Sequence, residues 1–272
     1  MLYIVATPIG NLSEITYRAV EVLSSVDAIL CEDTRHTRVL LDYYGIKKPL
    51  VSYQKFNEKQ KAEYVVERLS SGENLALVSD AGMPLISDPG KQLVDELIKN
   101  GLEYTVVSGP CAMVNAVVLS GMDTKNFCMV GFLPEKTVDK NRVIETYKNL
   151  PTTLVFYSPP HNIDDDLKFL AESLGDRRVS IVREISKMHE EVIRGNLTDI
   201  PQFTHKGEFV IVVEGEKSET NPLNELSVVE HIEAYIGGGM DKKDAIKQTA
   251  QDRKVAKSII YAEYEKQKNA KK

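Results

Sequence analysis

The sequence contains few cysteines and no long apolar run, and these two absences exclude several classes of protein. The three cysteines, Cys31, Cys111 and Cys128, are widely spaced and form no CxxC pair, which argues against a disulfide framework and a zinc knuckle. No uncharged apolar run approaches the roughly 18–20 residues that a membrane-spanning helix needs, and the first residues lack the basic stretch of a signal peptide. We therefore expect a cytoplasmic protein with reduced thiols and no membrane contact.

Common nucleotide and hydrolase signatures are also missing. GxGxxG, GxxxxGK[ST] and GxSxG do not occur, which disfavours a dinucleotide site, a P-loop and a serine-nucleophile elbow. His189-Glu190 begins an HExxH pattern, but Ile193 replaces the second histidine. We expect no bound metal.

The charge of the chain is unevenly distributed. The 272 residues carry a net charge of −6, with 42% hydrophobic and 27% charged residues, which is ordinary for a soluble globular protein. Residues 241–272 hold ten Lys or Arg and five Asp or Glu, so this tail is +5 and the first 240 residues are −11. The acidic body argues against nonspecific nucleic-acid binding by the whole chain, whereas the tail permits a local contact with a polyanion. A solvated helical face explains the same tail charges equally well.

Strand-like and helical runs alternate along the first half of the sequence. Short runs rich in Val and Ile predict strands at Leu2–Ala6, Ala28–Cys31, Leu50–Tyr53, Leu75–Ser79 and Tyr104–Ser108. Amphipathic segments at 14–25, 36–44, 58–71 and 90–100 predict helices, three of which end at Gly45, Gly72 and Gly101. This order favours a mostly parallel sheet in an α/β domain.

The second half predicts a mixed-sheet α/β domain followed by a helical tail. Its expected strands are Cys128–Gly131, Thr153–Tyr157, Val179–Arg183, Glu190–Gly195 and Phe209–Glu214, and its expected helices are 111–121, 138–148 and 162–174. We expect the last two strands to be antiparallel neighbours. The polar segment Glu216–Asn224 is typical of a linker, and 225–236, 242–251 and 255–268 predict three tail helices. The predicted domains are residues 1–118, 119–217 and 218–272.

Five predicted strands end in short loops rich in Gly, Pro, Asp and Ser. These loops are Thr7–Asn11, Ser79–Pro84, Ser108–Ala112, Gly131–Pro134 and Tyr157–His161. In open α/β sheets, ligands bind at the carboxyl ends of strands, where small residues let backbone groups approach a ligand. Any one of these loops is explained by an ordinary turn, but five together favour a ligand cleft between the two α/β halves.

Two charged clusters also follow predicted strands. They are Cys31–His36 and Arg183–Glu191, which place acidic, basic and cationic side chains within one turn of each other. Such sets can bind phosphate or assist proton transfer. A surface salt-bridge network is the common alternative.

Together these segments resemble the ribosomal RNA small subunit methyltransferase I family. The matching motifs run in order from residue 2 to residue 214: Leu2–Leu12 with Ile15-Thr16, Glu32–Arg35, Ser79–Pro84 with Ser87–Gly90, Ser108–Pro110, Gly131–Pro134, Tyr157–His161, and Arg183-Glu184 through Arg194-Gly195. The resemblance implies the fold of the tetrapyrrole-methylase-like methyltransferases, which is two α/β domains of the class III type with a cleft for S-adenosylmethionine (SAM). It also implies a homodimer that methylates the 2′-oxygen of a cytidine ribose in the decoding region of small-subunit (16S) ribosomal RNA, within an assembled or assembling subunit.

The resemblance also implies roles for individual residues. SAM is expected against Pro8, Asp80, Ala81, Gly82, Ser87, Ser108, Gly109, Ala112, Leu133, Phe156 and Tyr157, and proton removal is expected to involve Glu184 or Lys187. Asp80 suits the amine of the methionine part, and Phe156 and Tyr157 can pack against adenine. RNA contacts are expected at Glu32, Arg35 and Arg183, and in the tail at Lys242, Lys243, Arg253, Lys254 and Lys257.

The sequence leaves other functions open. One is a methylase of the same fold that acts on a tetrapyrrole or a protein side chain, although Ala6-Thr7-Pro8-Ile9-Gly10 stands where tetrapyrrole methylases have GxGPG. Another is a noncatalytic RNA-binding module, because the tail resembles a helix-turn-helix unit that can place a basic helix against nucleic acid. A tail that only extends the packing of the second domain explains the same pattern.

Overall fold

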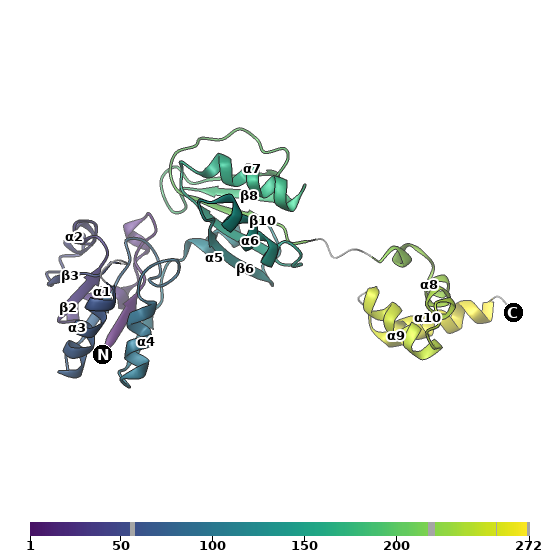
Figure 1. The fold of residues 1–272 in the computed structure, drawn as a ribbon, viewed down its shortest axis with the longest axis horizontal. Helices are drawn as coiled ribbons and strands as arrows, with labels where there is room; N and C mark the ends of the chain where they lie inside the picture. Colours follow the sequence, from purple (N-terminus) through teal and green to yellow (C-terminus); the bar gives the residue numbers. More distant parts are fainter. Residues whose placement is uncertain (55–57, 217–220, 254, 271–272) are drawn as a thin grey trace. The chain divides into compact units, whose positions relative to one another are not determined.

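The computed structural model describes residues 1–54, 58–216, 221–253 and 255–270 (Figure 1). The contacts within the chain form two compact units, Met1–Gly215 and Glu216–Lys272. The first unit contains two five-stranded sheets, and the second contains helices only, within its described residues. None of the described helices is long and apolar enough to cross a membrane.

The first sheet is entirely parallel and has the strand order β3-β2-β4-β1-β5. Its strands are β1 (Leu2–Val5), β2 (Ala28–Cys31), β3 (Leu50–Ser52), β4 (Leu75–Leu77) and β5 (Tyr104–Val107), and its helices are α1 (Tyr17–Ser25), α2 (Thr34–Tyr43), α3 (Glu58–Ser70) and α4 (Lys91–Lys99). A short 3-10 turn, η1 (Leu12–Glu14), precedes α1. Separate apolar cores lie against α1 and α2 and against α3 and α4. The predicted parallel sheet with both faces covered is confirmed.

Glycines end three of these helices as predicted. Gly45, Gly72 and Gly101 have φ of +67°, +95° and +65°, and a Cβ at any of them would meet nothing within 4 Å. The left-handed backbone that stops each helix therefore favours glycine for conformational reasons and not for packing.

The second sheet is mixed and has the strand order β6-β7-β10-β8-β9. Its strands are β6 (Phe127–Phe132), β7 (Thr153–Ser158), β8 (Arg178–Arg183), β9 (Glu191–Asn196) and β10 (Phe209–Val213). The expectation that β9 and β10 pair with each other is wrong, because β8 lies between them and is antiparallel to both. All five residues of β10 are buried, and β7 and β8 pair with its two sides, so no side of β10 is left for β9.

Helices cover both faces of the second sheet. Helix α5 (Ala112–Ser120) packs on β8 and β10 through Ala116 and Val117, whereas α6 (Thr137–Tyr147) and α7 (Ile163–Leu174) contribute to the core on the other face. The predicted boundary at residue 118 passes through α5, which packs as a whole with the second sheet.

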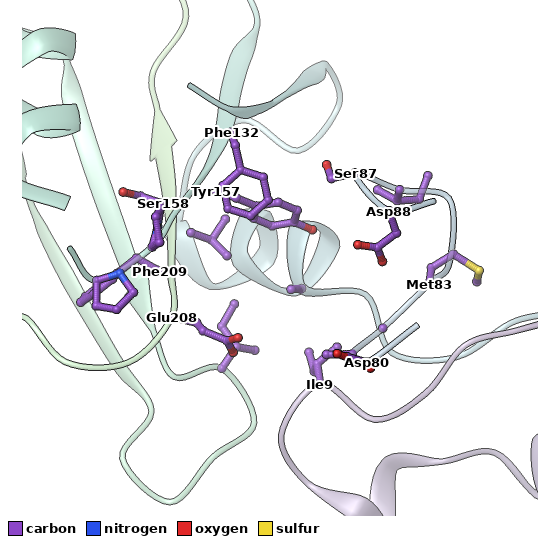
Figure 2. A pocket seen from close by; sticks show the side chains of 18 of the residues that line it. Ile9, Asp80, Met83, Ser87, Asp88, Phe132, Tyr157, Ser158, Glu208 and Phe209 are labelled. Atoms are coloured by element: carbon purple, nitrogen blue, oxygen red, sulfur yellow. The ribbon is translucent and has the colours of Figure 1, made fainter. Parts of the chain in front are cut away.

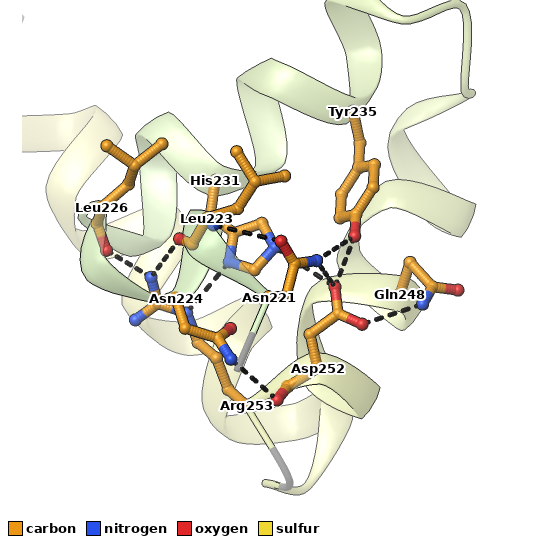
Figure 3. A network of polar contacts seen from close by, with 9 residues as sticks. All are labelled: Asn221, Leu223, Asn224, Leu226, His231, Tyr235, Gln248, Asp252 and Arg253. Atoms are coloured by element: carbon orange, nitrogen blue, oxygen red, sulfur yellow. Dashed lines mark hydrogen bonds and ion pairs between the residues drawn. The ribbon is translucent and has the colours of Figure 1, made fainter. Parts of the chain in front are cut away.

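The second unit contains three described helices around a small apolar core. They are α8 (Val228–Gly237), α9 (Lys242–Asp252) and α10 (Lys257–Ala270), preceded by the 3-10 turn η2 (Pro222–Glu225). Part of the expected linker Glu216–Asn224 belongs to this unit, because Asn221 and Asn224 donate hydrogen bonds to Asp252 (Figure 3). These partly buried side-chain contacts explain why a polar segment is structured here.

A polar network at the centre of this unit contains Arg253, one of the residues expected to contact RNA (Figure 3). Its Nε donates to His231 Nδ1 at 3.2 Å, so the fully buried imidazole carries its proton on Nε2, which lies 3.2 Å from Asp252 Oδ2. Burial and the Arg253 charge lower the pKa of His231, although Asp252 acts in the opposite direction. Arg253 also donates to the carbonyl of Leu226. The structure therefore uses Arg253 for packing within the unit.

The central position of β10 gives a stability prediction. Ile211→Ala removes a fully buried side chain from the middle of this strand, so we expect it to lower the free energy of unfolding by about 2–4 kcal/mol. Val138→Ala, at a side chain that is 71% exposed, should change it by less than about 0.5 kcal/mol. Urea denaturation followed by circular dichroism measures both values, and equal effects would contradict the central placement of β10.

Candidate functional site

One cavity of about 460 Å³ lies in the first unit, where the carboxyl ends of the parallel strands face one edge of the second sheet (Figure 2). All five of the predicted ligand loops contribute to it. Its lining residues are Ile9, Glu32, Asp80, Ala81, Gly82, Met83, Ile86, Ser87, Asp88, Ala112, Phe132, Tyr157, Ser158, Pro159, Pro160, Ile185, Glu208, Phe209 and Val210. A cavity therefore lies where the ligand cleft is predicted.

The loop after β4 forms much of one wall and is fixed by backbone pairing with the loop after β1. Thr7 donates its N–H to the Gly82 carbonyl at 2.9 Å, and Gly82 donates to the Thr7 carbonyl at 3.2 Å. Gly82 has φ of +81°, and a Cβ there would lie 3.2 Å from Ile9 Cγ2. Any side chain at Gly82 would therefore strain the backbone and press on Ile9, another residue of the wall.

Backbone strain is concentrated in two loops beside the cavity. Leu85, Ser87, Glu184 and Ser186 have φ between 51° and 72°, and they are the non-glycine residues with positive φ within the described ranges. Each such conformation costs on the order of 1 kcal/mol and persists only where the surroundings enforce it. Two lie in the 80–90 loop and two in the 184–190 loop, so the strain points to these loops as functional segments.

The opposite wall comes from the ends of β6 and β7 and the start of β10. Figure 2 shows Phe132 and Tyr157 facing the side of the cavity that holds Asp80, Ser87 and Asp88. The Phe132 and Tyr157 rings are 5.3 Å apart at a tilt of 51°, which gives the cavity an aromatic surface for a flat ligand. Burial and the neighbouring Cys111 and Asp88 raise the pKa of Tyr157 to about 12, so its hydroxyl is neutral at physiological pH.

Six of the eleven residues expected to bind the cofactor line the cavity: Asp80, Ala81, Gly82, Ser87, Ala112 and Tyr157. Phe156 and Leu133 instead lie in the core on the far face of the second sheet. Consecutive residues of a strand point to opposite faces, so Phe156 and Tyr157 cannot both face one ligand.

The other three expected cofactor residues, Pro8, Ser108 and Gly109, are outside the cavity lining. A Cβ at Gly109 would come within 2.9 Å of Ala6 Cβ, so this glycine allows close packing of two loops behind the wall.

Four carboxylates line the cavity, and within the described residues no Lys, Arg or His does. Burial, with the charges of Asp88 and Asp80, raises the pKa of Glu32 to about 7. Burial also raises the pKa of Asp88 to about 6, although a hydrogen bond to Ser79 opposes this shift. Asp80 Oδ1 accepts the Asp33 N–H at 3.3 Å. A partly buried wall of this charge favours a cationic ligand.

Sequence reasoning did not predict Asp88 or Glu208 in this wall, and it assigned Glu32 to RNA. The signal for Glu32 was its place directly after β2, at the carboxyl edge of the sheet. Glu208 stands before β10, and its approach to the cavity depends on the strand order that the sequence did not reveal. No group of three or more His, Cys, Asp or Glu is placed to hold a metal ion in the part of the chain that the structure describes.

The two residues expected to assist proton removal, Glu184 and Lys187, form an ion-pair cluster with Glu208 at the edge of the cavity. Lys187 Nζ lies 2.8 Å from Glu184 Oε1 and 3.0 Å from Glu208 Oε2. Burial opposes the Lys187 charge, but hydrogen bonds to both carboxylates raise its pKa above the ordinary value, so it is an ammonium at neutral pH. A Cβ at Gly10 would lie 2.5 Å from Lys187 Cγ. The loop after β1 therefore touches this cluster directly.

The residues expected to contact RNA differ in their surroundings. Arg183 is 9% exposed and donates to the His189 carbonyl at 3.2 Å. Arg35 is exposed and pairs with Asp33 at 2.7 Å. Lys242 pairs with Glu265 at 3.1 Å. Lys243 and Lys257 are exposed, and Lys254 lies outside the described residues. Arg183, like Arg253, is thus largely committed to internal contacts.

Residues 1–201 match the family model of the tetrapyrrole (corrin/porphyrin) methylases. The chain belongs to this family. Within it, the chain is a member of the group named ribosomal RNA small subunit methyltransferase I. Relatives of that name share 42% identity in Halalkalibacterium halodurans and 41% in Bacillus subtilis, over 97% of this chain and 94% of each relative. The Thermotoga maritima relative of the same name is 43% identical over 79% of this chain and 99% of its own length.

Solved structures of other proteins support the same fold. Diphthine synthase superposes with a TM-score of 0.62 at 14% identity, over 79% of this chain and 90% of that protein. The methyltransferase CobJ superposes with a TM-score of 0.61 at 18% identity, over 79% of this chain and 94% of that protein. At these identities the likeness shows the fold alone, which confirms the expected tetrapyrrole methylase architecture with a small helical unit at the C-terminus.

The raised pKa of Glu32 makes the stability of this methylase depend on pH. The folded protein holds the Glu32 proton up to about pH 7 and the unfolded chain only up to about 4.5, so this stabilisation is present below pH 4.5 and is lost as the pH rises to 7. We expect Glu32→Gln to raise the free energy of unfolding by about 1 kcal/mol at pH 8, allowing for solvent screening, and to change it less at pH 5. Urea titrations at both pH values test this, with the exposed Glu21→Gln as the control. A change in the free energy of unfolding that is the same at both pH values would contradict the raised pKa of Glu32.

Proposed function

We propose that this protein transfers the methyl group of SAM to the 2′-hydroxyl of a cytidine ribose in the decoding region of small-subunit (16S) ribosomal RNA. The observation that carries the proposal is the 42% identity to a ribosomal RNA small subunit methyltransferase I that extends over 97% of this chain. The assignment of the ribose 2′-oxygen and of the cytidine rests on the sequence resemblance to the family. The absence of the GxGPG loop disfavours the tetrapyrrole substrates after which the family is described.

The cavity fits SAM in size and in chemistry. Its volume of about 460 Å³ lies within the roughly 300–1,000 Å³ typical of small-molecule sites. SAM carries a sulfonium, an ammonium and an adenine ring, and it supplies an electrophilic methyl group. The carboxylates of Glu32, Asp80 and Asp88 complement the positive charges, and the rings of Phe132 and Tyr157 offer a surface for the adenine.

The residues of this chain would then act mainly by alignment. Loops on both walls would hold the acceptor hydroxyl in line with the donor methyl group, which removes much of the entropic barrier. The 2′-hydroxyl proton needs an acceptor, and a positioned base adds about 10²–10⁴-fold. Lys187 is already protonated, so we assign proton acceptance to a carboxylate of its cluster, with Glu184 as our candidate. We assign Lys187 the stabilisation of negative charge on the ribose oxygen.

The helical tail is proposed to add affinity for RNA but no chemistry. The match to the Thermotoga maritima relative uses 99% of that protein but 79% of this chain, about the length of the first unit. Residues 241–272 of this tail carry +5 while the first 240 residues are acidic, so the cations of this segment can attract the phosphate backbone. Among the expected RNA contacts there, Lys243 and Lys257 are exposed and suited to this role.

We also propose that the protein acts as a cytoplasmic homodimer, as the resemblance implies. Exposed apolar side chains on the edge strand β5 and on α5 support self-association. They are Tyr104, Val106, Val114 and Val118, with exposed fractions between 39% and 68%. Sedimentation of the purified chain measures this association in the absence of RNA, and a monomer at micromolar concentration would contradict it.

The methyl transfer is tested directly with labelled SAM and small ribosomal subunits. We expect the full chain to label 16S RNA at a 2′-oxygen, detected as an internucleotide bond that resists alkaline hydrolysis. Lys187→Ala should lower kcat by at least about 10²-fold and leave the SAM dissociation constant within about threefold. Lys148→Ala, at a half-buried lysine that pairs with the exposed Glu145, is the control and should act like the wild type. Labelling of a precorrin, or of neither substrate, would overturn the proposal.

The tail is tested by the salt dependence of subunit binding. Lys243→Gln with Lys257→Gln should flatten the slope of log K against log salt by about 0.7–0.9 for each lysine–phosphate ion pair that is removed. Arg253→Gln should instead lower the thermal stability of the tail, because Arg253 supports His231. An unchanged slope in the double lysine variant would remove the tail from the RNA interface.

A further inference from the structure

A buried ion pair lies directly behind one wall of the cavity. Strand β7 ends at Ser158, which is 2% exposed, and its chain neighbours Tyr157 and Pro159 both line the cavity. Ser158 Oγ donates to Asp166 Oδ2 at 2.8 Å. Lys140 Nζ donates to the other carboxylate oxygen, Oδ1, at 2.7 Å. The two charged residues come from α7 and α6, so the network joins two helices to the cavity wall.

Burying this network costs more desolvation free energy than filling the same space with apolar side chains. The side chains of Asp166 and Lys140 are 3% and 12% exposed, and they lie on helices whose other inward side chains, such as Ile144 and Leu167, form an apolar core. Removing two charges from water costs several kcal/mol each, and apolar residues of similar volume often stabilise a fold as well or better. Stability alone therefore does not explain the pair.

The geometry of the pair shows what it controls. Both oxygens of Asp166 are bound, and its own N–H donates to the Asn162 carbonyl at 2.8 Å in the first turn of α7. The Lys140 ammonium also lies 5.4 Å from the centre of the Phe169 ring, which holds it from a second direction. Because the Asp166 carboxylate is held in place, its hydrogen bond also holds the Ser158 hydroxyl in place. Ser158 stands where the chain turns from the strand into Pro159-Pro160.

We propose that Lys140 and Asp166 are positioning residues that act through Ser158 to hold the Tyr157–Pro160 wall in the shape that binds the methyl donor. The inference rests on the proposed function in its choice of SAM as the probe. It gives Lys140 and Asp166 a role although neither lines the cavity. The ribosomal substrate is not needed to test it.

The first test compares SAM binding with folding stability in the full chain. We expect Ser158→Ala and Asp166→Asn each to weaken SAM binding about 5–20-fold by calorimetry, with the double variant no worse than the more affected single variant, because the residues act as one unit. Lys140→Arg should retain binding and Lys140→Met should lose it. Asp139→Asn and Arg142→Met, at an exposed pair on the same helix, are the matched controls and should stay within about twofold. Lower urea midpoints with unchanged SAM affinity would show a merely structural pair and overturn the proposal.

A second readout does not depend on SAM. In protein labelled with ¹³C at the tyrosine rings, the Tyr157 resonance is identified by its loss in Tyr157→Phe. Ser158→Ala and Asp166→Asn should shift or broaden this resonance, whereas Asp139→Asn should leave it in place. If the wild type fails to bind SAM, the proposed function fails while this spectrum still decides the positioning role. An unmoved Tyr157 resonance in both variants would overturn it.

Discussion

The structure depends on three partly buried carboxylates, Glu32, Asp80 and Asp88, in one cavity whose described lining contains no Lys, Arg or His. Burial and mutual repulsion hold the pKa of Glu32 near 7 and that of Asp88 near 6, so the folded chain keeps these groups in a state that disfavours their charge. Ser87, with its strained backbone, lies in the same wall, and Leu85, with the same strain, stands two residues before it. A chain selected for stability alone would relieve both features. They are consistent with a site whose missing positive charge is supplied by its ligand.

The fold was largely predictable where each element is specified by its own residues. Strands such as Ala28–Cys31 carry their apolar pattern locally, and helix ends such as Gly45 carry their stop signal locally. Strand order is different, because it depends on contacts between distant segments. Phe209–Val213 could have paired with β9 by proximity in sequence, but it pairs instead with β7 and β8, and β7 lies more than 50 residues before it.

The same difference between local and long-range information explains which parts of the site were predictable from the sequence. The rule that ligands lie at the carboxyl ends of strands located the five loops, and each of them contributes to the cavity. Side-chain direction was less predictable: Phe156 belongs to the opposite face although Tyr157 beside it is in the wall. Charge counting likewise could not separate Arg253, which stabilises His231 inside the tail, from the exposed Lys243. Function was assigned from the resemblance, because no single loop identifies a methyl donor or a ribose.

An acidic cavity and a polyanionic substrate impose opposite electrostatic demands on one chain. The first 240 residues are −11, so bulk attraction cannot bring RNA to the cavity, and cationic contacts have to be local. Two cations of the first unit are neutralised by partners: Lys187 by Glu184 and Glu208, and Arg35 by Asp33. Excess positive charge is instead concentrated in residues 241–272, which contain α9 and α10 and carry +5. Under the proposed function, RNA affinity in that segment lets the cavity stay negative for its cationic cofactor, so different parts of the chain meet the two charges that it has to bind.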